Sequence, residues 1–126
     1  MMRKKLTLAL FMTLFTTSAF CANDGLLYKF KNESFLLKKE CVSSISIIPS
    51  EYVGVEVLNT QLVDNSECAR KLNSLIDKNI GGEMSTFFNG NLWHTSNIVD
   101  SVKTENSFRM TSDEAGLVQK AYDYYH

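Results

Sequence analysis

Short hydrophobic segments at the start of the chain alternate with polar residues in the way that β-strands do. The segments "GLLYKF" and "SFLLKKE" are separated by Lys31-Asn32-Glu33, which predicts a first hairpin or two edge strands. In "SSISIIP", Ile45 and Ile47 alternate with serines, as in a half-buried strand. Pro49 should end that strand, because proline cannot donate to a β-ladder.

The next segment, "EYVGVEVLN", also has a period of two. Val53, Val55 and Val57 alternate with Gly54 and Glu56. We therefore expect Val55 and Val57 to face a core and Glu56 to face water.

The period changes to steps of three and four in "DNSECARKLNSLIDKNIGG", which predicts an α-helix. Its apolar face consists of Cys68, Ala69, Leu72, Leu75, Ile76 and Ile80. Asp64, Asn65 or Ser66 can cap the start of this helix. Gly81-Gly82 should end it in the left-handed conformation that glycine tolerates.

A hairpin is predicted where "EMSTFF" and "NLWHTSNIV" flank Asn89-Gly90, because both turn residues accept the positive φ of a type I′ turn. In such a hairpin Phe88 faces Asn91 and Phe87 faces Leu92. Alternation then places Trp93 and Thr95 on the face of Phe88, and His94 and Ser96 on the face of Phe87. Trp93 and His94 should therefore point in opposite directions and form no joint site.

The last part of the chain predicts a connection, a strand and a second helix. "SVKTENSFRM" supplies the connection and the strand, and Thr111 to Glu114 has the spacing of a capping box. The apolar face of the helix consists of Ala115, Val118, Ala121, Tyr122 and Tyr125. This order of elements predicts an α+β domain with two helices packed on one face of an antiparallel sheet.

The N-terminus has the three parts of a secretory signal peptide. Basic Arg3, Lys4 and Lys5 precede an apolar core, and small residues lead to an exit that we place after Cys21. Cleavage after Ala19 is the alternative, and a membrane anchor is disfavoured because the uncharged stretch is short and rich in Thr and Ser. Residues 1–21 are thus predicted as signal and 22–126 as one domain in the periplasm.

Lipidation of Cys21, which would make an outer-membrane lipoprotein, is the minority alternative. Bacterial lipoprotein signals usually place a small residue just before the cysteine, and Phe20 stands there.

Composition and cysteine usage agree with export. The chain has 13 basic and 14 acidic residues, and loss of the signal's three bases leaves 10 against 14, a net charge of −4. No basic stripe is present, so nucleic acid and anionic membrane surfaces are poor partners. Cys41 and Cys68 remain as an even pair in an oxidising compartment, which predicts a disulfide that stabilises the fold by about 3.5 kcal/mol.

The segment from Val53 to Tyr122 resembles the periplasmic head subdomain of the SecD and SecDF translocon accessory proteins. The resemblance rests on the strand ending in Val57-Leu58, the turn Asn79-Ile80-Gly81, the hairpin at Asn89-Gly90, the strand Phe108-Arg109-Met110 and the box from Thr111 to Glu114. That family usually has a proline step on the outgoing hairpin strand, where this chain has His94 to Asn97. It also carries transmembrane helices, and none is predicted here after the signal. The resemblance implies a free head-like domain that contacts polypeptide chains.

No catalytic, metal-binding or cofactor-binding set of residues is apparent. The sequence shows no residue pattern that would supply His94 or His126 with a catalytic partner. The cysteines and histidines also lack zinc-ligand spacing. We therefore expect a protein- or peptide-binding module that is not an enzyme, or alternatively an immunity or inhibitor protein that neutralises a secreted toxin or hydrolase. The candidate binding residues are Phe88, Asn89, Gly90, Asn91, Trp93 and His94. We expect Trp93 to be partly exposed as an aromatic anchor, with burial in the core as the alternative.

Overall fold

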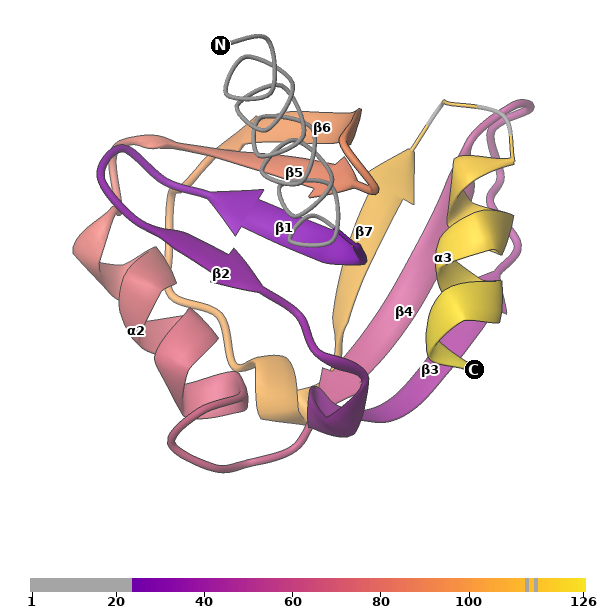
Figure 1. Ribbon diagram of the computed structural model, residues 1–126. Coiled ribbons are helices and arrows are strands. Elements are labelled where there is room, and N and C mark those ends of the chain that lie inside the picture. Colours follow the sequence, from indigo (N-terminus) through magenta and orange to yellow (C-terminus); the bar gives the residue numbers. More distant parts are fainter. Residues whose placement is uncertain (1–23, 113, 115) are drawn as a thin grey trace, which may run out of the picture.

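The computed structural model describes residues 24–112, 114 and 116–126, so the predicted signal peptide lies outside the described residues. These residues form strands, two short 3-10 helices (η) and two α-helices (Figure 1). In order they are β1 (Leu26–Lys29), β2 (Ser34–Leu36), η2 (Lys39–Cys41), β3 (Val42–Ile48), β4 (Glu56–Leu62), α2 (Ala69–Lys78), β5 (Glu83–Phe88), β6 (Asn91–Asn97), η3 (Thr104–Asn106), β7 (Phe108–Ser112) and α3 (Leu117–Tyr125).

The α+β class is confirmed, but the strands form two sheets where one was expected. One sheet has the order β2-β1-β5-β6 and the other the order β3-β4-β7, and all pairs are antiparallel. The two helices contact different elements: α3 contacts β3 and β4, whereas α2 contacts η3 on the other side of the molecule (Figure 1). Strand β7 pairs with β4 and not with β6, so the two sheets have separate edges there.

The predicted face of β4 is wrong. Its buried side chains are Leu58, Thr60 and Leu62, whereas Val57 is only half-buried and Val53 is fully exposed. The cause is a turn at the start of the predicted strand, where Val55 N donates to Tyr52 O and Gly54 has a φ of +83°. Alternation therefore begins later in the chain than the valines suggested.

The first predicted helix is confirmed, with a shorter apolar face. The Asn65 side chain accepts hydrogen bonds from Cys68 N (2.8 Å) and Glu67 N (3.0 Å), which satisfies donors just before α2. Gly81 has a φ of +94°, as expected after a helix end. Ile80 lies beyond the helix and is 49% exposed, so it isn't part of the buried face.

The second helix begins later than the predicted capping box. Thr111 and Ser112 belong to β7, and the Ser112 hydroxyl accepts from Glu114 N at 3.1 Å. Helix α3 begins at Leu117, after Gly116 with a φ of +79°, and no side chain caps it. Pairing of Ser112 with Glu56 of β4 holds this segment in the sheet, which outweighs the local capping signal. Ala115, predicted on the helix face, lies outside the described residues.

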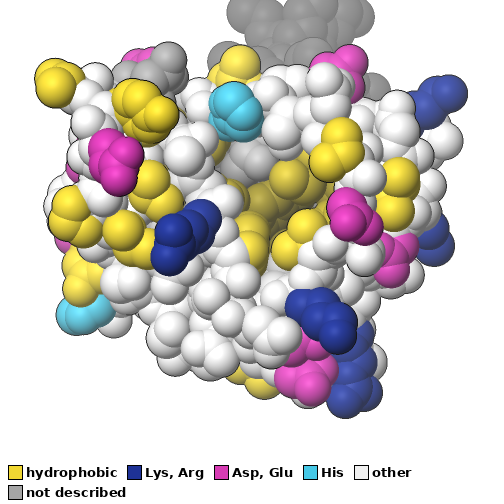
Figure 2. All heavy atoms as spheres, turned by 180° about the vertical axis from the view of Figure 1, so that it is seen from behind, with side chains coloured by type: hydrophobic (Ala, Val, Ile, Leu, Met, Phe, Trp, Pro, Cys, Tyr) yellow, Lys and Arg dark blue, Asp and Glu magenta, His cyan; other side chains and the backbone are white. Residues whose placement is uncertain are grey.

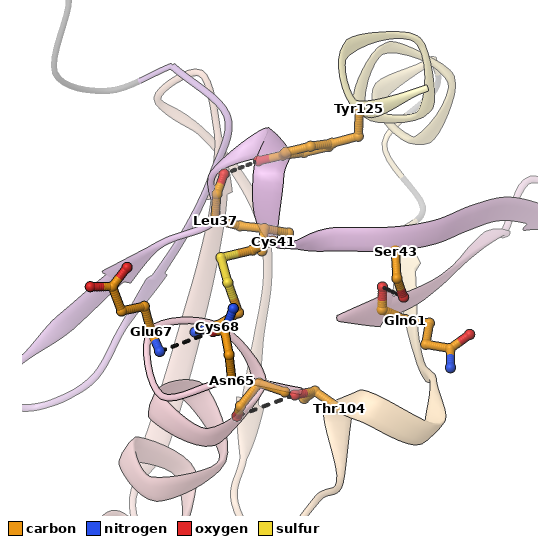
Figure 3. Close-up of a disulfide and its surroundings, with 10 residues drawn as sticks. Leu37, Cys41, Ser43, Gln61, Asn65, Glu67, Cys68, Thr104 and Tyr125 are labelled. Carbon is orange, nitrogen blue, oxygen red and sulfur yellow. Dashed lines mark hydrogen bonds between the residues drawn. A yellow bond between two sulfur atoms is a disulfide. The ribbon is translucent and has the colours of Figure 1, made fainter. Parts of the chain in front are cut away.

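The predicted disulfide is confirmed between Cys41 and Cys68, with the Cα atoms 5.2 Å apart (Figure 3). It joins the end of η2 to the residue before α2, and both cysteines are buried. Nearby, the Tyr125 hydroxyl donates to Leu37 O at 2.7 Å and accepts from Leu26 N at 2.7 Å. These contacts connect the C-terminal helix to the first two strands.

Candidate binding site

The β5–β6 hairpin has the predicted turn and, near it, the predicted register. Asn89 and Gly90 have φ values of +49° and +85°, and Phe88 lies opposite Asn91 while Phe87 lies opposite Leu92. The Asn89 side chain also accepts from Gly25 N at 2.7 Å, which ties the turn to the start of β1.

Beyond Leu92 the register shifts, and the predicted separation of Trp93 from His94 is wrong. Thr86 pairs with His94, so Trp93 is an extra residue with no partner in β5. A β-bulge of this kind restarts the alternation of side chains. Trp93 and His94 consequently line the same cavity.

The expected exposure of Trp93 is also wrong, because its side chain is only 3% exposed. The indole Nε1 donates to Thr111 O of β7 at 3.0 Å. Trp93 therefore connects the edge of one sheet to the edge of the other, and a buried indole N–H finds the partner that it needs.

A cavity of about 310 Å³ opens beside this junction. Figure 2 shows it as a hollow with hydrophobic side chains on its floor and a histidine and a basic side chain near its rim. Its lining consists of Tyr28, Leu72, Ile76, Met84, Thr86, Trp93, His94, Ser96, Val102, Phe108, Arg109, Met110 and Thr111. Both sheets and α2 thus contribute, and the volume lies at the lower end of the range for ligand pockets.

A second hollow of about 220 Å³ continues the first one. It shares Ile76, Met84, Ser96 and Val102 with the first and extends along the segment from Asn97 to Ser101. The two hollows form a groove, which we call the β6–β7 groove, and both adjoin the end of β6.

The polar chemistry of the cavity is sparse. His94 and Arg109 are its charged or titratable groups other than Tyr28, and its lining includes no Asp or Glu. The Tyr28 hydroxyl donates to the Met110 sulfur at 3.1 Å, across the two sheets. Burial first, and the Tyr125 charge second, raise the pKa of Tyr28 well above its usual value, so its hydroxyl remains neutral.

Of the predicted binding residues, Trp93 and His94 belong to the cavity and the others do not. Phe88 is buried against the ring of Tyr124, with centroids 5.9 Å apart, and Asn89 to Asn91 form the hairpin tip. The missed lining residues include Met84, Phe108 and Met110. They lie in strands whose apolar residues alternate with polar ones, and this pattern predicts core residues as readily as a binding surface. The two methionines were the one signal in the sequence of an adaptable surface.

Among the described residues no group of His, Cys, Asp and Glu could hold a metal ion, and no helix there is long and apolar enough to cross a membrane. Comparison with protein-family models, curated proteins and solved structures finds no match. The likeness to the SecD head therefore rests on the residues quoted for it.

Proposed function

We propose that this chain is an exported, non-enzymatic protein- or peptide-binding module that holds an apolar segment of its partner in the β6–β7 groove. The observation that carries the proposal is the open cavity between the two sheets, with an apolar floor and a few polar groups at its rim (Figure 2). A concave apolar site of this kind is the usual place for a ligand.

The composition of the floor favours an adaptable partner site. Met84 and Met110 lie on opposite sheets and both line the cavity. Methionine is unbranched and polarisable, so it can adjust to different apolar side chains. The resemblance to the SecD head, whose family contacts polypeptide chains, supports the same class of partner.

The disulfide supports the export part of the proposal. Cys41 and Cys68 are bonded, and disulfides persist in oxidising compartments such as the bacterial periplasm. The predicted signal peptide supplies the route.

The chemistry of the cavity supports binding without turnover. To act as a general base, His94 would need an orienting carboxylate and a nucleophile that it can activate. The lining contains no acid, and among the described residues the hydroxyl groups of Thr86, Ser96 and Thr111 make no hydrogen bond to His94. We expect no hydrolase or transferase activity from the purified protein. Turnover that disappears in His94→Ala, with the fold retained, would contradict this.

A peptide-display selection tests the binding function. The immobilised protein is challenged with randomised peptides, and the enriched sequences are assayed against two variants. Ser96→Trp places an indole in the groove, because Ser96 lines both hollows, and should abolish binding. Thr95→Trp is the matched control, since Thr95 is exposed on the other face of β6 beside Ser85. No enrichment, or equal binding by both variants, would refute the proposal.

The alternative role as an immunity or inhibitor protein predicts a different outcome in the periplasm. Affinity purification followed by mass spectrometry should then give one enzyme in stoichiometric amount. A module that holds extended segments should give many unfolded clients, all displaced by the selected peptides.

A further inference from the structure

Strand β4 lies between β3 and β7, and alternate residues of β4 direct their backbone N–H and C=O groups to one neighbour or the other. Val63, the residue directly after β4, donates its N–H to Cys41 O at 2.8 Å. The backbone N–H and C=O groups of the odd-numbered residues of β4 therefore point toward β3. Successive residues of an antiparallel strand direct their N–H and C=O groups to opposite sides, so even-numbered residues such as Leu58 face β7. Leu58 lies opposite Met110, and it follows that the even-numbered residues of β7 bond to β4.

The odd-numbered residues of β7, Arg109 and Thr111, therefore direct their backbone groups away from β4 and toward the groove. The bond from Trp93 Nε1 to Thr111 O agrees with this direction. Strand β7 is the last strand of its sheet, so among the described residues no further strand pairs with the outward N–H and C=O of Arg109 or the outward N–H of Thr111. An edge of this kind is a template for another strand.

The side chains of β7 define what such a strand would present. Phe108 and Met110 line the floor of the cavity. Arg109 borders the cavity at its rim, and its exposed side chain projects, by alternation along the strand, from the outer face of β7. A residue paired with Arg109 would share its outer face, and the two neighbours of that residue would point into the cavity. An acidic residue is the complementary partner of Arg109, and apolar residues are complementary to the floor.

We propose that the occupant of the groove is an extended polypeptide segment with an apolar–acidic–apolar pattern, which adds a strand to the free edge of β7. The acidic residue exchanges both backbone hydrogen bonds with Arg109, and its two apolar neighbours enter the cavity. Trp93 ends the new strand, because its indole already occupies the Thr111 carbonyl. This inference rests on the proposed function and specifies how the partner binds.

Synthetic peptides of about ten residues test the mode of binding, with Kd measured from the emission of Trp93, the one tryptophan of the chain. The central triplets are Leu-Glu-Leu, Leu-Lys-Leu and Ser-Glu-Ser. We expect the first to bind at least about tenfold more tightly than the third, and two- to five-fold more tightly than the second, as typical cross-strand pairs give. Methylation of the glutamate amide nitrogen should abolish binding, whereas methylation of the next leucine amide should have little effect, because that amide points away from β7.

Two variants of Arg109 separate its backbone from its charge. Arg109→Ala should weaken Leu-Glu-Leu two- to five-fold and remove the preference over Leu-Lys-Leu. Arg109→Pro removes the outward backbone N–H as well as the charge, and an edge strand tolerates proline at such a position. Because the peptide then loses one backbone hydrogen bond, its binding should weaken by more than about tenfold. Should the proline variant fail to fold, the methylated peptides on the unmodified protein still decide the matter.

Two results distinguish the failure of this mode from the failure of the function. Strand addition is refuted if two results occur together. The display-selected peptides bind the unmodified protein but not Ser96→Trp, and methylation of any one of their backbone amides leaves that binding unchanged. The binding function itself fails if no peptide of either origin binds. Binding of a simple alkyl ligand in the cavity, without any peptide binding, would also overturn the proposal.

Discussion

Replacement of Trp93 gives the sharpest test of the structure, because the sequence alone favoured an exposed ring. The side chain is 3% exposed and its Nε1 bonds to Thr111 O, so Trp93→Ala removes a buried ring and a contact between the two sheets. Truncation of a buried tryptophan costs about 3–5 kcal/mol, and we expect about 3 kcal/mol because one side of the ring already borders the cavity. Trp93→Phe retains most of the packing and should cost about 1–2 kcal/mol, mainly for the lost hydrogen bond.

Urea unfolding followed by far-ultraviolet circular dichroism measures these losses without the tryptophan signal. With a slope of about 1–3 kcal/mol per molar urea, the midpoint of Trp93→Ala should fall by about 1–3 M. Leu92→Ala is the matched control, because Leu92 is the adjacent residue and is 54% exposed; its free energy of unfolding should change by less than about 0.5 kcal/mol.

Two results would refute this account of Trp93. One is a free energy of unfolding for Trp93→Ala within about 0.5 kcal/mol of the unmodified protein. The other is an emission maximum typical of an exposed indole, with rapid quenching by acrylamide, in the unmodified protein.

Two further predictions concern the connections of the C-terminal helix and the disulfide. Joint replacement of Cys41 and Cys68 by serine should lower the free energy of unfolding by about 3.5 kcal/mol and Tm by roughly 15 °C, measured by thermal unfolding, with groove binding unchanged; two reactive thiols in the denatured, unreduced protein would contradict the bond. Tyr125→Phe should cost roughly 1–3 kcal/mol in urea unfolding, because Leu26 N and Leu37 O lose their shared partner. Burial raises the pKa of Tyr125 above its ordinary value of 10.0, so its contribution is complete below pH 10 and is lost as the pH rises further. Stability of the unmodified protein should therefore fall more steeply above pH 10 than that of Tyr125→Phe, and parallel profiles would contradict the assignment.

Local signals in the sequence were sufficient for several elements. Asn89-Gly90 predicted the hairpin turn because few residues accept two consecutive positive φ values. The spacing of Leu72, Leu75 and Ile76 predicted α2, since one helix face must be apolar to pack. The pairing of Cys41 with Cys68 was predicted from the even count of cysteines that remains after the predicted signal peptide, and it is confirmed.

The binding site depended on features that no local pattern contains. A bulge at Trp93 reversed the expected faces of the hairpin, and the two candidates that had been separated, Trp93 and His94, came to line one cavity. A single inserted residue has this effect because side chains in a strand alternate with a period of two.

By itself, the sequence determined the class of the fold, its helices, its hairpin turn and its disulfide, because each depends on residues that are close in the chain or on simple chemical pairing. Only the tertiary structure decided that β7 pairs with β4 and leaves an edge free toward β6. Strand partners are chosen by the packing of residues far apart in the chain, and several partners suit the same alternating pattern. The groove exists because that choice leaves the two sheets joined at Trp93 and Thr111 and open beyond them.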